Sequence, residues 1–391
     1  MKLAAARIMC RTRRSFEGKD SWRISADHHR IDEVSEDIFS RLMRMFSQPG
    51  PVNLDLAREI SRHLSGEAQP LNPWTTEELV ELVRLAEYQV TEVAPFSFPP
   101  ASAVIPLGPR EWGDAMVEEL AELAEPFAAQ MRDSAQGQPW AMLAPLGPVM
   151  AGAQLGAWTG MMAGRVVGSS ETGLPAVSSN RTLLVATVIE DLSEELSVDG
   201  RQVRMWAALY ETAHRAVFTL PHVMDSYRAL NEKYAATVKL APESLMEQLG
   251  SITDPSAIFE LDLNVNETSL FDASSSGTAQ EDLEAFMGVT AAMSRRLVRE
   301  AGSRLLPDVE EIFMDRDLNA GLDDGTDQTG MLVTVSQDAI EDGAVFLNEV
   351  EERFGPQAAA RIWQPEGLPT AWEVSDPVGW AARVLLDDPL W

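Results

Sequence analysis

The segment 206–214 holds the residue types of a metal-dependent hydrolytic site. It reads W-A-A-L-Y-E-T-A-H, which is the helical H-E-x-x-H pattern with Tyr210 at the first histidine position. In the intact pattern two histidines one helical turn apart bind Zn²⁺, and the glutamate is the general base for a metal-bound water. Glu211 and His214 are kept here, but the first ligand is not. Because five-residue patterns with one mismatch arise by chance, these residues alone favour an ordinary packed helix face.

The composition indicates a globular, acidic protein. The chain has 391 residues, 45% of them hydrophobic, which is enough for a large core. Its formal net charge of −30 repels nucleic acid and anionic membranes, so we expect no nucleic-acid partner. Residues 1–30 are rich in basic side chains without a following apolar stretch, which predicts a disordered leader, or an over-extended start of the reading frame, and not a secretory signal. The remaining residues, 31–391, are predicted to form the folded domain.

The single cysteine, Cys10, lies in the basic leader, so neither a disulfide framework nor a cysteine-based metal site is expected. This cysteine usage predicts a cytoplasmic protein.

Hydrophobic periodicity predicts a mostly helical domain. Apolar residues recur every three or four positions in segments 32–46, 53–64, 76–93, 110–128, 201–218, 242–249 and 281–305. The best strand candidate is the run 182–188, shortly before the helix that carries Glu211 and His214. The proline-rich segment 94–109 is predicted to be an extended connector. Mobile loops are predicted near 264–280 and 315–330.

Glycines at every fourth position mark a further helix. Segment 134–164 has no charged residue, and Gly152, Gly156, Gly160 and Gly164 form a ridge of the kind that lets helices approach closely. Prolines shorten the apolar run to about 16 residues, fewer than a membrane span needs. The pattern therefore favours a buried helix that packs through its glycine face over a transmembrane helix.

Two C-terminal patterns remain. Segment 315–327 reads D-R-D-L-N-A-G-L-D-D-G-T-D and is similar to a calcium loop, but its glycine comes one place late and the closing glutamate is missing. A solvated acidic loop is the better interpretation. Trp363, Trp372, Trp380 and Trp391 alternate with prolines, which predicts a cover for the core, with an interaction surface as the alternative.

Four landmarks in order carry a resemblance to a known family. They are G-P-V-N-L-D-L-A-R at 50–58, G-A-Q-L-G at 152–156, the helix with Trp206, Glu211 and His214, and the closing stretches R-I-W at 361–363, L-P-T at 368–370 and D-P-V-G-W at 376–380. Together they resemble the actinobacterial zincin-like metallopeptidases of type 2, often labelled hydrolases or deazaflavin-cofactor-biosynthesis-associated proteins. The resemblance implies a mainly α, zincin-like metallopeptidase fold with a small β element before the motif helix.

The resemblance also implies a site. The first zinc histidine of the family falls on Tyr210, the base on Glu211 and the second histidine on His214. The third ligand, a glutamate before a glycine on a later helix, falls on Met287. A neutral phenol with a pKa of about 10 and a soft thioether are poor Zn²⁺ ligands, so we expect a vestigial site with Glu211 as a vestigial general base.

Three other side chains are possible substitute ligands. Glu284 precedes Met287 by almost one helical turn, and His222 and Asp225 follow the motif helix. No other catalytic arrangement is evident, since the chain has five histidines, no G-x-S-x-G elbow and no phosphate-binding glycine loop.

The sequence therefore predicts a catalytically inactive zincin-like protein without a cofactor. In this interpretation the former active-site cleft binds a polypeptide, a small ligand or a partner protein, and the protein is neither a nucleic-acid binder nor a membrane-spanning protein. The alternative is a zinc-dependent peptidase or hydrolase with a rearranged ligand set.

Overall fold

The computed structural model describes residues 50–135, 147–175, 180–240, 271–272, 277–321 and 332–386. These residues belong to one unit of the chain, Gln48–Trp391. The expected leader 1–30 and the expected helices 32–46 and 242–249 lie outside the described residues. Residues 277–280 and 315–321, expected in mobile loops, are helical, and the other residues of those two ranges, apart from a short strand at 271–272, are not described.

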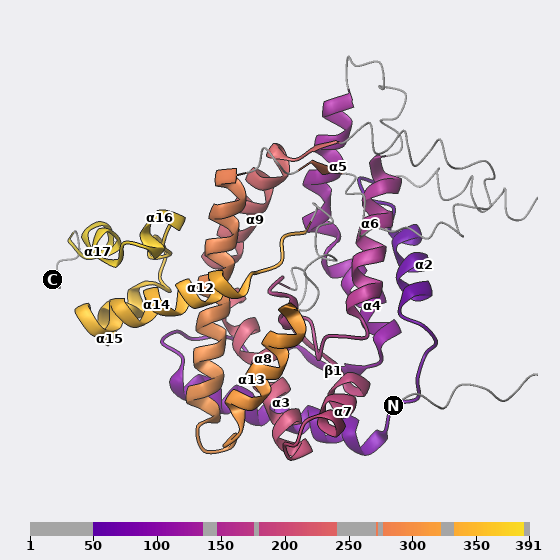
Figure 1. Cartoon of the computed structure of the whole chain (residues 1–391), viewed down its shortest axis with the longest axis horizontal. Coiled ribbons are helices and arrows are strands. Elements are labelled where there is room, and N and C mark those ends of the chain that lie inside the picture. The colour runs from indigo at the N-terminus through magenta and orange to yellow at the C-terminus, as the bar shows by residue number, and fades with distance from the viewer. Residues whose placement is uncertain are drawn as a thin grey trace, which may run out of the picture. The chain divides into compact units, whose positions relative to one another are not determined.

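Helices make up most of the described structure (Figure 1). The N-terminal half contains α2 (Leu54–Leu64), α3 (Pro73–Val93), α4 (Pro109–Glu119), α5 (Ala121–Ala135), α6 (Gly147–Met162), the 3₁₀ turn η2 (Ser170–Thr172) and α7 (Ala186–Glu195). The C-terminal half contains α8 (Gly200–Phe218), α9 (Pro221–Thr237), α12 (Gly277–Gly302), α13 (Val309–Gly321), α14 (Gln337–Phe354), α15 (Pro356–Arg361), α16 (Ala371–Val374) and α17 (Pro377–Leu385). Segment 110–128, predicted as one helix, is divided between α4 and α5 at Leu120.

A small parallel sheet precedes the motif helix, as the sequence predicts. Strand β1 (Ala103–Leu107) pairs with β2 (Arg181–Val185), with Ile105 opposite Leu183. The other described strands, β3 (Lys239–Leu240) and β4 (Phe271–Asp272), form an antiparallel pair. Gly168 bridges to Leu184, and the Val185 N–H donates to the Val167 carbonyl at 2.8 Å. The segment that follows α6 is thereby fixed alongside β2.

The glycine face of α6 packs against α2, which confirms the predicted buried helix. A Cβ at Gly152 would lie 2.3 Å from the Asn53 carbonyl oxygen, and a Cβ at Gly156 would lie 2.3 Å from that of Ala57. A Cβ at Gly160 would also meet α2, at Leu64. Within the described residues, no helix has the length and apolar character that crossing a membrane requires.

Helix α8 lies in the core of this unit. Its start is capped by Asp199, whose side chain accepts a hydrogen bond from the Arg201 N–H at 2.9 Å. Every side chain from Met205 to Phe218 is buried, because α3, α7, α9 and α12 surround the helix (Figure 1). Helix α12 packs against α8 and also against α14, which belongs to the C-terminal group of helices.

Candidate functional site

Tyr210 takes part in a buried aromatic cluster with Trp206 on its own helix and Phe313 on α13. Its ring stacks on Trp206 at a centroid distance of 5.5 Å and meets the edge of Phe313 at 6.1 Å. The guanidinium of Arg295, on α12, is within hydrogen-bonding reach of the Tyr210 hydroxyl. Burial raises the pKa of Tyr210 above its ordinary value, and Arg295 opposes part of that rise. Tyr210 is therefore a neutral phenol beside a cation near pH 7.

Arg295 is itself held by a two-bond ion pair. Its Nη2 donates to Asp317 Oδ1 at 2.6 Å and its Nη1 to Oδ2 at 3.2 Å, while the guanidinium carbon lies 5.4 Å from the Phe313 ring centroid. A second pair joins Arg316 to Glu171. The motif pattern did not point to these arginines, which come from α12 and α13.

A pocket of about 480 Å³ opens beside these groups. Trp206, Tyr210 and Phe313 give it an aromatic wall, and the two arginine–carboxylate pairs give it polar groups. Asp191 and Glu195 are exposed and also line it. The volume falls within the range of about 300–1,000 Å³ that small-ligand pockets occupy.

Glu211 faces the interior of the protein instead of this pocket. Its Oε1 accepts from the Ser170 N–H at 2.8 Å, and its Oε2 lies 2.8 Å from the Ser170 hydroxyl and 3.2 Å from that of Ser169. Burial raises the pKa of Glu211 to about 7, although the serine hydrogen bonds act in the opposite direction. The absence of a Cβ at Gly168 makes room for the carboxyl, since a Cβ there would lie 2.3 Å from Oε1.

His214 is buried in an apolar environment. Its ring centroid lies 4.7 Å from that of Phe218, and at most one of its two ring nitrogens meets a polar group among the described residues, the backbone of Leu174. Burial lowers the pKa of His214 to about 4, partly offset by the nearby backbone of Leu174. The imidazole is therefore neutral over the physiological pH range.

Met287 lies on α12, which packs against α8, and its side chain is fully buried. Its Cε would be 3.4 Å from a Cβ at Gly173, and the next residue, Leu174, lies beside His214. The chain at 173–174 thus lies near both His214 and Met287. The assignment of Met287 to the third ligand position stays a prediction.

The three possible substitute ligands point to different places. Glu284 accepts from Gln280 at 2.8 Å and lines a groove that does not include Met287. Asp225 is exposed, with Arg228 at 3.5 Å. His222 is half-buried. Burial lowers its pKa, and a hydrogen bond with the Trp363 backbone partly offsets this effect. Among the described residues, no three His, Cys, Asp or Glu side chains form a group that could hold a metal ion.

The donors at the inherited positions do not fit Zn²⁺. Tyr210 is paired with a guanidinium, Met287 offers only a thioether, and Glu211 is engaged by two serines. The positive charge of Arg295 beside Tyr210 repels a divalent cation. Among sulfur ligands Zn²⁺ prefers thiolate, so the Met287 thioether is a poor ligand. His214 alone keeps the character of a ligand.

Comparison with known proteins agrees with this fold. The family model described as "Zincin-like metallopeptidase" matches residues 52–381. A crystal structure described as a "putative hydrolase with a novel fold from Chloroflexus aurantiacus" is similar, with a TM-score of 0.61 and 22% sequence identity. The similarity covers 85% of this chain and 98% of that chain, and at this identity it shows the fold alone. None of the curated proteins matches the chain.

Proposed function

The chain belongs to the zincin-like metallopeptidase family, and we propose that it is a non-catalytic member that binds a peptide or small ligand in the pocket beside Tyr210. The observation that carries this proposal is the position of Tyr210 itself. The residue that replaces the first zinc histidine lines the 480 Å³ pocket and has the Arg295 guanidinium beside its hydroxyl.

The pocket combines surfaces that suit an amphipathic ligand. The aromatic wall formed by Trp206, Tyr210 and Phe313 offers apolar area to a ligand side chain. The Arg295–Asp317 and Arg316–Glu171 pairs offer both donors and acceptors to amide groups. A peptide segment presents both kinds of group along its length.

The orientation of Glu211 supports binding without hydrolysis. Hydrolysis by the ancestral mechanism needs a carboxylate next to a metal-bound water. Glu211 instead accepts from Ser170 within the core, with its pKa near 7, and it does not line the pocket.

One observation favours a second candidate, a zinc-dependent hydrolase with a rearranged ligand set. Of the two buried ring nitrogens of His214, at most one meets the Leu174 backbone, and the other has no hydrogen-bond partner among the described residues, which is unusual for a buried polar group. A metal would satisfy one of them if Glu284, His222 or Asp225 moved to complete the site.

A pocket-filling variant tests the first proposal. Gly164 lines the pocket, and a Cβ there meets no atom within 4 Å, so Gly164→Trp should fold while occupying the binding volume. Gly277→Trp is the matched control, because Gly277 is equally open and does not line this pocket. An array of random peptides about eight residues long is then probed for binding and for cleavage, with and without added Zn²⁺.

We expect wild type and Gly277→Trp to bind the same peptides without cleaving them, and Gly164→Trp to lose this binding. Binding that survives in Gly164→Trp would place the ligand elsewhere. Zinc-dependent cleavage that chelation abolishes would support the hydrolase instead.

A further inference from the structure

A groove of about 770 Å³ lies between the start of α12, helix α14 and the corner formed by α16 and α17. It shares no lining residue with the pocket beside Tyr210, and nothing in the proposed function depends on it. Helices α14 and α16 pack against α12, and α17 packs against both of them; these C-terminal helices are drawn in yellow in Figure 1. Large apolar side chains are exposed along it: Trp372 is 76% exposed and Val345 56% exposed. Of the four tryptophans expected to cover the core, Trp363 and Trp380 are buried, Trp372 is exposed, and Trp391 lies outside the described residues.

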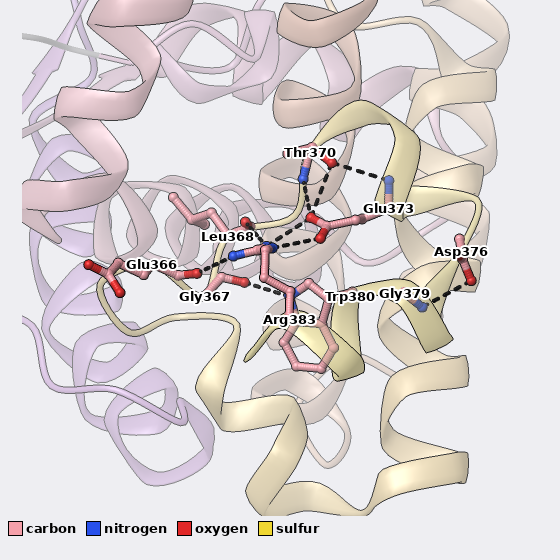
Figure 2. A network of polar contacts seen from close by, with 9 residues as sticks. All are labelled: Glu366, Gly367, Leu368, Thr370, Glu373, Asp376, Gly379, Trp380 and Arg383. Carbon is pink, nitrogen blue, oxygen red and sulfur yellow. Dashed lines mark hydrogen bonds and ion pairs between the residues drawn. The ribbon is translucent and has the colours of Figure 1, made fainter. Parts of the chain in front are cut away.

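Figure 2 shows how the corner that carries Trp372 is fixed. Thr370 and Glu373 form a capping box around α16, and Arg383 binds both carboxylate oxygens of Glu373 at 2.6 and 2.8 Å. The Trp380 indole N–H donates to the Gly367 carbonyl at 2.7 Å. Because these contacts hold both sides of a four-residue helix, Trp372 is presented from a fixed backbone. Because the backbone at Trp372 is already ordered, binding through its ring orders only the side chain and so loses less conformational entropy.

The charged side chains that line the groove are all acidic. Its lining includes six acidic residues and no lysine or arginine: Glu281, Asp282, Glu284, Asp338, Asp342 and Glu349. Lys233 pairs with Asp282 and Arg353 with Glu349. Glu281, Asp338 and Asp342 have no ion-pair partner among the described residues.

We propose that this groove docks an extended segment of a partner polypeptide in which arginine or lysine stands next to an apolar residue. The apolar residue covers Val345 and part of the Trp372 ring. The cation lies over the ring face and reaches the unpaired carboxylates, which combines a cation–π contact with charge-assisted hydrogen bonds. A second copy of this chain fits poorly, since two such grooves repel each other and the chain carries a net charge of −30. Nucleic acid is excluded for the same reason.

The test uses the full chain and a fluorescein-labelled peptide of about ten residues in which arginine and leucine alternate. Affinity is measured by fluorescence anisotropy. Trp372→Ala removes the exposed ring, and Trp74→Ala is its matched control, because Trp74, on α3, is 81% exposed and does not line the groove. Glu281→Gln with Asp342→Asn removes two unpaired charges. Glu77→Gln with Glu81→Gln removes two exposed charges from α3 and controls for net charge.

We expect Trp372→Ala to weaken binding about tenfold and the Glu281/Asp342 pair to weaken it by a similar factor. The two control variants should change the affinity less than about twofold. Equal losses in the groove and control pairs would reduce the binding to non-specific charge attraction and overturn the proposal. So would equal binding of a peptide with glutamine in place of arginine, or a dimer in sedimentation that Trp372→Ala abolishes.

Discussion

Replacing Gly156 by alanine should destabilise the protein, although alanine is the better helix former. Gly156 lies on the face of α6 that meets α2, where an added Cβ would come within 2.3 Å of the Ala57 carbonyl oxygen and 2.8 Å of its Cα. Ordinary contact begins near 3.4 Å, so the two helices would have to separate by about 1 Å. Because the opposing atoms belong to the backbone, no side-chain rotation can relieve the clash.

The expected magnitude follows from two opposing effects. Overpacking costs about 1–3 kcal/mol and more where the neighbours cannot move, which applies here. The higher helix propensity of alanine returns about 1 kcal/mol. With a cost above about 3 kcal/mol against a return of about 1, we expect Gly156→Ala to lower the free energy of unfolding by about 2 kcal/mol or more, measured by urea denaturation followed by circular dichroism.

The same sequence pattern supplies the control. Gly164 continues the four-residue repeat, but a Cβ at Gly164 meets no atom within 4 Å. Gly164→Ala should therefore change the free energy of unfolding by less than about 0.5 kcal/mol. Equal effects at both positions, or an unchanged stability of Gly156→Ala, would refute the packing of α6 on α2 as the reason for the glycine ridge.

Three further predictions concern the inherited site and the C-terminal corner. The pKa of Glu211 is about 7 in the folded state and about 4.5 in the unfolded state, so between these pH values only the folded state keeps the proton. Glu211 therefore destabilises the folded state increasingly as the pH rises from about 4.5 to 7. Measured by urea denaturation, the free energy of unfolding of Glu211→Gln relative to wild type should increase by up to about 1.4 kcal/mol per pH unit between pH 4.5 and 7. A difference that does not change with pH would contradict a buried neutral carboxyl. Tyr210→His combined with Met287→Glu should bind zinc more tightly than the two single variants predict together, as measured by competition with a chelator; purely additive affinities would argue against Met287 as the third inherited position. Arg383→Gln should lower the free energy of unfolding by about 1 kcal/mol, because Arg383 is partly exposed and solvent screens its pair with Glu373; no change in urea denaturation would show that the corner is held without it.

Much of the fold could be predicted because local signals and tertiary packing agree. Asn53 has a residue type that commonly caps helix N-termini, and it caps α2 by accepting a hydrogen bond from the Leu56 N–H. The glycine repeat at 152–160 predicted close approach, and the structure shows the backbone of α2 against it. Such features depend on spacing within one segment, which a sequence displays directly.

The sheet could be predicted only in part. The run 182–188 was expected to be one strand, but β2 ends at Val185 and α7 begins at Ala186. Its residues favour strand locally, and packing against α8 decides the boundary instead. Strand β1 falls in the segment expected to be a connector, since it contains Pro106 and pairs with residues far along the chain.

The environment of the motif could not be predicted from the motif. The groups that bind Glu211 come from Ser169 and Ser170, about forty residues earlier, and no pattern connects them to the motif helix. Arg295 lies on the same helix as Met287, but two turns beyond it, and only the packing of α12 on α8 brings it to Tyr210. The substitutions at 210 and 287 were visible in the sequence, while the groups that now surround them were not.

The close fit of Gly168 against Glu211 makes position 168 informative about relatives of this chain. Any residue with a Cβ at this position would meet the carboxyl oxygen at 2.3 Å, so the carboxyl would have to turn away from Ser170. In a related sequence, a larger residue at position 168 together with a glutamate at position 211 would indicate a carboxyl that no longer bonds to the serine at 170. A glycine at 168 followed by two serines would instead indicate a relative in which this glutamate is buried and bonded to those serines. One backbone position, distant in sequence from the motif, could thus sort members of the family by the state of their inherited base before any of them is purified.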